Sequence, residues 1–64
     1  MLEFTMYYHN RPESCFSDIN DAAKYLWPHN VARRLQAIEE LESFHETANG
    51  PLMCKRTDPD AYKD

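Results

Sequence analysis

The chain has 64 residues, a formal net charge of −4, and a composition that is 42% hydrophobic and 28% charged. A chain of this length forms one domain at most and buries a smaller share of its surface than a larger domain does. The acidic balance disfavours a non-specific grip on nucleic acid, which Lys and Arg would have to make. One Trp, four Tyr and three Phe argue against intrinsic disorder.

The location of the protein is predicted from what the sequence lacks. It contains no run of eighteen apolar residues, and Glu3 and Thr5 interrupt the short apolar stretch at the N-terminus. These features predict a cytoplasmic protein with no membrane contact. In a reducing compartment we expect Cys15 and Cys54 to act as small hydrophobic residues, with a structural disulfide as the less favoured alternative.

The first predicted element is a strand. From Leu2 to Tyr8 every second residue is apolar, which is the period expected of a strand with one buried face. The segment Asn10–Ser14 follows, and it combines turn-forming residues with Pro12, which cannot donate to a strand ladder. We therefore predict that the strand ends in this turn.

A short helix is predicted next. Ser17 or Asp18 can cap it, because either side chain accepts from free backbone N–H groups of the first turn. Pro28 disfavours a helical conformation at the residue before it, so the helix is expected to close near Leu26. Its apolar residues recur at helical spacing: Ile19, Ala22, Ala23 and Leu26.

A longer amphipathic helix is predicted from His29 to Ala48. At 100° per residue its apolar side chains fall within about half of the circumference. They are Val31, Leu35, Ala37, Ile38, Leu41, Phe44 and Ala48. The sequence Asn49-Gly50-Pro51 is expected to stop the helix, because Gly favours a left-handed residue and Pro forbids continuation.

The predicted fold class is α+β in the order strand, helix, helix, strand. Leu52–Arg56 is interpreted as the second strand, and two helices would then pack on a short two-stranded antiparallel ribbon. Residues 1–57 form the single small domain, and we expect residues 58–64 to be a flexible tail. Such a ribbon is marginally stable alone and has free edges, which favours a homodimer.

No catalytic or metal site is predicted. The soft metal ligands are His9, His29, His45, Cys15 and Cys54, and they form none of the closely spaced pairs that structural zinc sites use. The only local cluster with the residue types of nucleophilic catalysis is His9, Glu13, Ser14 and Cys15. A turn is expected to hold polar residues in any case, so we predict no enzyme activity and no cofactor.

The longer helix carries the candidate binding surface. Its basic residues lie near its N-terminal end and its acidic residues follow, which opposes the helix dipole. Exposed aromatic residues beside Arg are typical of interface anchors. The predicted partner-binding residues are Tyr25, Trp27, Arg33, Arg34, Glu39, Glu40, Glu42, His45 and Glu46. Within this set, Arg34, Glu42 and His45 project into the apolar arc, where they need a partner or a local contact.

One segment carries a family resemblance. Asp21–Leu26, with the sequence DAAKYL, resembles the first helix of the winged helix-turn-helix in phage excisionases, and Val31 and Arg33-Arg34 stand near the place of the recognition helix. The resemblance implies a DNA-binding regulator. Its nucleic-acid-binding residues would be Lys24, His29, Arg33 and Arg34.

The leading functional hypothesis is a small non-catalytic protein-binding module. It would act as a regulator or inhibitor, of the kind that phages encode against host proteins, by binding another protein through its second helix. The DNA-binding regulator is the alternative. A third hypothesis is an acidic nucleic-acid mimic, in which Glu39, Glu40 and Glu46 would form the ridge that matters.

Overall fold

The computed structural model describes residues 3–57. The flexible tail predicted at 58–64 therefore lies outside the described residues. Within residues 3–57, no helix combines the length and the hydrophobicity that crossing a membrane requires.

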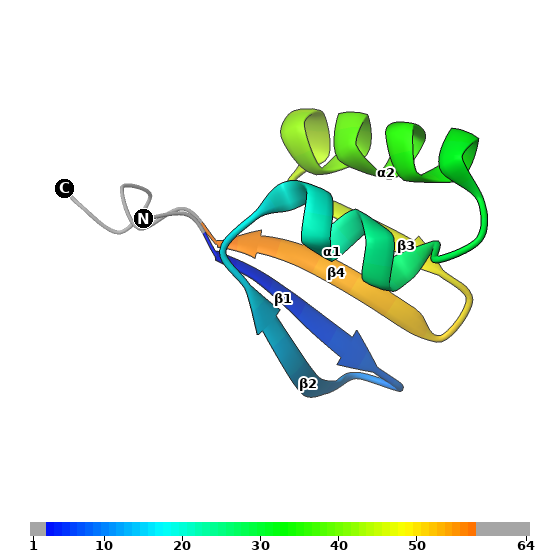
Figure 1. Ribbon diagram of the computed structural model, residues 1–64. Helices are drawn as coiled ribbons and strands as arrows, with labels where there is room; N and C mark the ends of the chain where they lie inside the picture. The colour runs from blue at the N-terminus through cyan, green and yellow to red at the C-terminus, as the bar shows by residue number, and fades with distance from the viewer. Residues whose placement is uncertain (1–2, 58–64) are drawn as a thin grey trace, which may run out of the picture.

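Six elements follow one another along the chain: β1 (Glu3–Tyr8), β2 (Arg11–Phe16), α1 (Ile19–Leu26), α2 (Val31–Phe44), β3 (Glu46–Asn49) and β4 (Leu52–Thr57). The strands form one antiparallel sheet in the order β2-β1-β4-β3, and both helices cover one of its faces (Figure 1). The predicted α+β class is confirmed. The predicted two-stranded ribbon is wrong, because a hairpin at each end of the chain gives a four-stranded sheet.

The strand predicted from Leu2 to Tyr8 is confirmed as β1 over Glu3–Tyr8, and Leu2 lies outside the described residues. Phe4 and Met6 are buried on the helix side, as the alternation predicted, whereas Tyr8 is 48% exposed at the end of the strand. β1 pairs with β4 from Glu3↔Thr57 to Tyr8↔Leu52. The first and last predicted strands are thus direct neighbours in the centre of the sheet.

The predicted turn at Asn10–Ser14 is wrong, because most of it belongs to β2. The turn is shorter: His9 and Asn10 have φ of 49° and 67°. Two positive φ angles in a two-residue loop define the hairpin turn whose twist matches the flanking strands. Pro12 is tolerated because β2 is an edge strand, and Glu13 bulges where the register shifts between Met6 and Tyr7.

The predicted first helix is confirmed as α1. The Asp18 carboxylate is its N-cap and accepts from the backbone N–H of Asn20 at 2.8 Å. The helix ends at Leu26, two residues before Pro28, as expected from the restriction that proline places on its predecessor. The predicted apolar positions face the sheet, with Ala22, Ala23 and Leu26 fully buried.

The predicted second helix is confirmed in its body and wrong at its C-terminal end. α2 starts at Val31, where the Asn30 side chain accepts from the backbone N–H of Arg33 at 3.1 Å. It ends at Phe44 and not at Ala48, because His45 adopts a left-handed conformation with φ of 64°.

Strand β3 consists of Glu46–Ala48, which were predicted to continue the helix, and Asn49, which was predicted to stop it. They pair with β4, and this ladder satisfies the backbone groups that a longer helix would have satisfied. Asn49-Gly50-Pro51 is therefore a hairpin turn and not a helix stop. Gly50 has φ of 64° at the first loop position, where a type II′ turn requires a positive value.

The core is small. It consists of Phe4, Met6, Ala22, Ala23, Leu26, Ala37, Leu41 and Cys54, so that three of its eight side chains are alanine. Because alanine buries little apolar area, the larger side chains from β1, α1 and α2 contribute most of the hydrophobic stabilisation. Of the two cysteines, Cys54 is buried as predicted, Cys15 is exposed, and both are free thiols.

Replacing His45 with Gly should stabilise the protein. A side chain in the left-handed region costs about 1–2 kcal/mol, which glycine avoids at the expense of a more flexible unfolded chain. We expect the free energy of unfolding, measured by urea denaturation, to rise by about 0.5–1 kcal/mol. His45→Ala keeps the Cβ and should bring no such gain, so an equal gain from both variants would contradict the explanation.

The buried thiol should make stability fall at high pH. Burial raises the pKa of Cys54 from the ordinary 9.0 to about 11. Between these values the unfolded chain loses a proton that the folded chain keeps. The stability that the neutral, buried Cys54 thiol contributes is therefore fully present below about pH 9 and is lost as the pH rises through about 11. Urea midpoints between pH 8 and 11 should fall less steeply for Cys54→Ala than for the wild type, while Cys15→Ala keeps most of the slope.

Candidate protein-binding surface

The apolar arc of α2 is only partly used by the core. Ala37 and Leu41 are buried against the rest of the molecule and Ile38 is half-buried, whereas Val31 and Leu35 are 63% and 64% exposed. At 100° per residue, the exposed pair lies about a third of a turn away from the buried pair. An apolar strip on the flank of α2 is thus left open to solvent.

This strip borders a groove between the two helices. Ala23 of α1 and Ile38 of α2 line the groove together with Val31 and Leu35, and polar residues form its rim. The volume of the groove is about 270 Å³. The rim residues are Asn20, Asp21, Lys24 and Arg34. The two helices run in opposite directions (Figure 1), so the groove follows the length of the helical hairpin.

A second hollow continues along the same pair of helices. It has a volume of about 330 Å³ and lies between the N-terminal end of α1 and the C-terminal end of α2, with Phe4 and β4 beside it. Glu42, one turn beyond Ile38, and Arg56 of β4 bring opposite charges to this end. The two hollows together are called the hairpin groove below.

Arg34 is held at the rim of the groove by the end of α1. Its Nε donates to the Trp27 carbonyl at 2.7 Å, and one terminal guanidinium nitrogen donates to the Pro28 carbonyl. Carbonyls at the C-terminal end of a helix lack partners within the helix. Arg34 therefore fastens α2 to the chain that leaves α1, and its guanidinium is already hydrogen-bonded.

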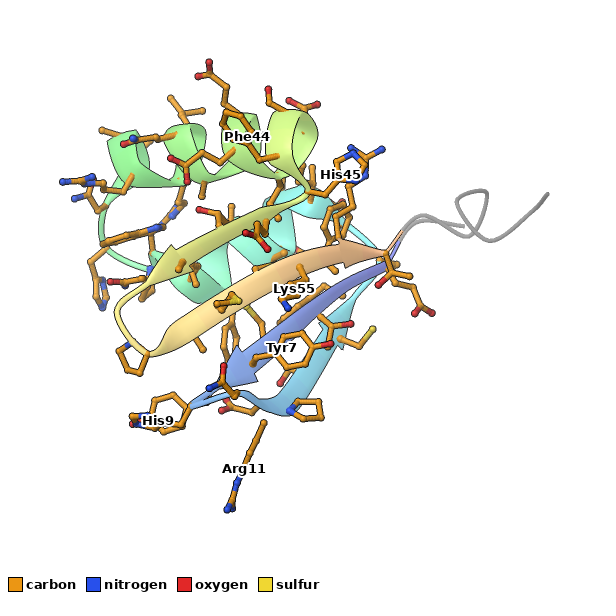
Figure 2. All side chains as sticks on the ribbon, turned by 180° about the vertical axis from the view of Figure 1, so that it is seen from behind. Tyr7, His9, Arg11, Phe44, His45 and Lys55 are labelled. Atoms are coloured by element: carbon orange, nitrogen blue, oxygen red, sulfur yellow. The ribbon has the colours of Figure 1, made fainter. Side chains whose placement is uncertain are left out.

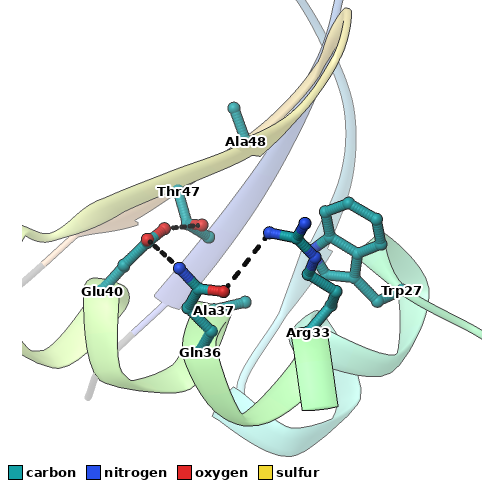
Figure 3. A pocket seen from close by; sticks show the side chains of 7 residues that line it. All are labelled: Trp27, Arg33, Gln36, Ala37, Glu40, Thr47 and Ala48. Atoms are coloured by element: carbon teal, nitrogen blue, oxygen red, sulfur yellow. Dashed lines mark hydrogen bonds between the residues drawn. The ribbon is translucent and has the colours of Figure 1, made fainter. Parts of the chain in front are cut away.

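Arg33 points to the other side of α2, into a small notch (Figure 3). Its guanidinium lies 5.6 Å from the centre of the Trp27 ring and donates to Gln36 at 3.4 Å. Gln36 donates to Glu40 at 3.5 Å, and the buried Thr47 hydroxyl donates to Glu40 at 2.6 Å. The notch holds about 70 Å³, enough for roughly two waters. We interpret it as the seam between α2 and β3 and not as a ligand pocket.

The other predicted partner-binding residues are scattered. Tyr25 donates to the Glu13 carboxylate of β2, a hydrogen bond that raises the pKa of the tyrosine hydroxyl. Glu39 is exposed on α2, and His45 is the left-handed residue after that helix. Glu46 lies on β3 opposite Lys55, so the predicted acidic ridge of Glu39, Glu40 and Glu46 does not run along one helix.

The predicted basic cluster for nucleic acid is also divided. Lys24 and Arg34 line the hairpin groove, Arg33 lies in the notch, and His29 is exposed in the connection between the helices. The reason is geometric, because Arg33 and Arg34 are consecutive helical residues and project about 100° apart.

The sheet face opposite the helices carries Tyr7 and Lys55, which lie close together in Figure 2. Its centre holds Tyr7, whose ring is covered by Lys55, with the ammonium 5.5 Å from the ring centre. Cys15 lies beside Thr5, with 3.9 Å between the thiol sulfur and the hydroxyl oxygen. Within residues 3–57, no three His, Cys, Asp or Glu side chains gather where they could hold a metal ion.

Three residues of α1 that line the first hollow were not among the predicted binding residues: Asn20, Asp21 and Ala23. Their signal is weak, since two are ordinary polar helix residues and the third fits the core pattern equally well. Only the packing of α1 against α2 places them opposite Val31 and Leu35.

Comparisons with family models, with curated proteins and with solved structures find no match to this chain.

Replacing Arg34 should destabilise the fold more than replacing Arg33. Arg34→Lys keeps the charge but cannot donate to both carbonyls in the same fork. We expect a loss of about 1–2 kcal/mol in the free energy of unfolding for Arg34→Lys. The more exposed Arg33→Lys should lose about 0.5 kcal/mol or less. Equal losses of the free energy of unfolding, measured by urea denaturation, would show that the carbonyl contacts of Arg34 stabilise the fold no more than the contacts of Arg33 do.

Proposed function

We propose that this chain is a non-catalytic protein-binding module, a small regulator or inhibitor that binds another protein with the hairpin groove. The observation that carries the proposal is the exposure of Val31 and Leu35 beside a groove whose interior is apolar. Single exposed aliphatic residues are ordinary, but an apolar strip with a polar rim is typical of an interaction site.

The anatomy of the groove supports a helical or extended protein segment as ligand. Apolar side chains spaced along a helix pack into such grooves, and rim charges then set orientation. Lys24 and Arg34 outnumber Asp21 in the first hollow, and Asp18 and Glu42 outnumber Arg56 in the second. The net charge of the rim therefore distinguishes the two directions of a bound segment.

The engagement of the basic residues favours protein binding over the DNA-binding alternative. Of the four residues that the alternative needs, Arg34 is bonded to two carbonyls and Arg33 is stacked on Trp27. A recognition helix also needs its N-terminal residues free to enter the major groove. Here those residues are engaged within the protein.

Leu35→Glu should abolish partner binding without unfolding the protein. A charge in the apolar strip would be desolvated in the complex, whereas in the free protein position 35 is 64% exposed and tolerates it. Wild-type and variant proteins would be immobilised, and captured proteins identified by mass spectrometry and then titrated by calorimetry.

Ser43→Glu is the matched control, because Ser43 is exposed on α2, two turns from Leu35, and projects about 130° away from the middle of the groove. The proposal predicts that this control keeps the captured partner and that Leu35→Glu loses it. Equal binding by both variants would refute a role for the groove.

A further inference from the structure

We propose that the hairpin groove binds a second copy of this chain, with the two α2 helices antiparallel across a two-fold axis that passes between Leu35 and Ile38. This inference rests on the proposed function, since it names a second copy as the protein that occupies the same groove. A different protein that binds the groove must then compete with this self-association. In a two-fold dimer the same surface serves both subunits, so that surface must be complementary to itself.

The shape of the surface meets this requirement. Each copy presents a ridge, made by the exposed Val31 and Leu35, directly beside a groove lined by Ala23 and Ile38. Rotation about the axis places the ridge of one copy in the groove of the other, and the reverse. Leu35 then packs near the partner's Ile38, and the apolar strips cover each other.

The charges meet the requirement as well. In the first hollow, beside Val31, Lys24 and Arg34 outnumber Asp21, so that this end of the groove has a net positive charge. In the second hollow Asp18 and Glu42 outnumber Arg56, so that the opposite end has a net negative charge. An antiparallel pairing brings Lys24 beside the partner's Glu42 at both ends of the interface. A parallel pairing would bring like charges together.

The order of charges along α2 then acquires an explanation. Arg near the N-terminal end and Glu further along oppose the dipole of the helix that carries them. Arg33 and Glu40 lie in the notch on the other side of α2 and take no part in this pairing. Arg34 and Glu42 line the groove, and across the two-fold axis each lies toward the opposite net charge and the opposite dipole end of the partner. The arrangement that is unfavourable within one helix is favourable between two.

The edges of the sheet do not offer an equally good interface. On the β2 edge, Pro12 removes a backbone donor and the bulge at Glu13 disrupts the ladder. The β3 edge has only four residues, and Glu46 begins it. Both features are typical of edges that resist pairing with another strand, so association is directed to the helices.

The test is a charge exchange across the proposed axis, read by sedimentation equilibrium. The wild type should dimerise, and Lys24→Glu and Glu42→Lys should each raise the dimer dissociation constant by about tenfold or more, since two contacts change per dimer. The double variant Lys24→Glu/Glu42→Lys should return it to within about threefold of the wild type.

The controls carry the same changes of net charge away from the groove. Arg11→Glu on β2 and Glu46→Lys on β3 should leave the dissociation constant unchanged. Glu42→Gln serves as a second variant should Glu42→Lys unfold beside Arg56, and circular dichroism verifies the folding of each variant.

A wild type that stays monomeric at several hundred micromolar would overturn the proposal. So would a dimer that responds equally to the controls, or one that the double variant does not restore. A monomer that captures a different protein, and loses it in Leu35→Glu, would reject the second copy as occupant while upholding protein binding by the groove.

Discussion

The ladder between β1 and β4 is the constraint on which the other elements depend. It joins Glu3–Tyr8 to Leu52–Thr57, the first and last described segments of the chain. β2 and β3 then add to the two outer edges through tight hairpins. The chain between them must cross one face of the sheet, and the two helices accomplish this crossing. All helical packing is therefore on that face.

The helices approach the sheet through small side chains. Ala22, Ala23 and Ala37 are fully buried, which allows close packing but removes little apolar area from water. On α2, Val31 and Leu35 project about a third of a turn away from the buried Ala37 and Leu41. The larger aliphatic residues Val31 and Leu35 are thus left outside the core. A core built on small side chains thus limits the stability of this short chain and leaves an apolar strip of α2 open to solvent.

Elements with a local signal could be predicted from the sequence, and elements formed by pairing could not. β1, α1, the body of α2 and most of β4 carry their own alternation, caps or helical periodicity. β2 lacks such a pattern, because Pro12 and Glu13 interrupt it, and its strand conformation depends on the turn at His9 and Asn10 and on the neighbouring β1. Glu46–Asn49 fits a helix or a strand, and pairing with β4 decides between them.

The candidate surface could likewise be predicted from the sequence only in part. The half-apolar circumference of α2 could be predicted from spacing alone, but which part of it is covered depends on where α1 lies. The predicted basic cluster failed to form for a related reason. Neighbouring residues in sequence, Arg33 and Arg34, contact different parts of the molecule, Trp27 on one side and the end of α1 on the other.

The pairing of Glu3 with Thr57 also determines how the domain would respond to mechanical load. Tension applied through these two neighbouring residues would act across the central ladder and not along it. Hydrogen bonds would then open one after another from that end, like a zipper, instead of resisting together in shear. A domain held in this way yields at low force, and opening it would separate the two β-hairpins as the first step.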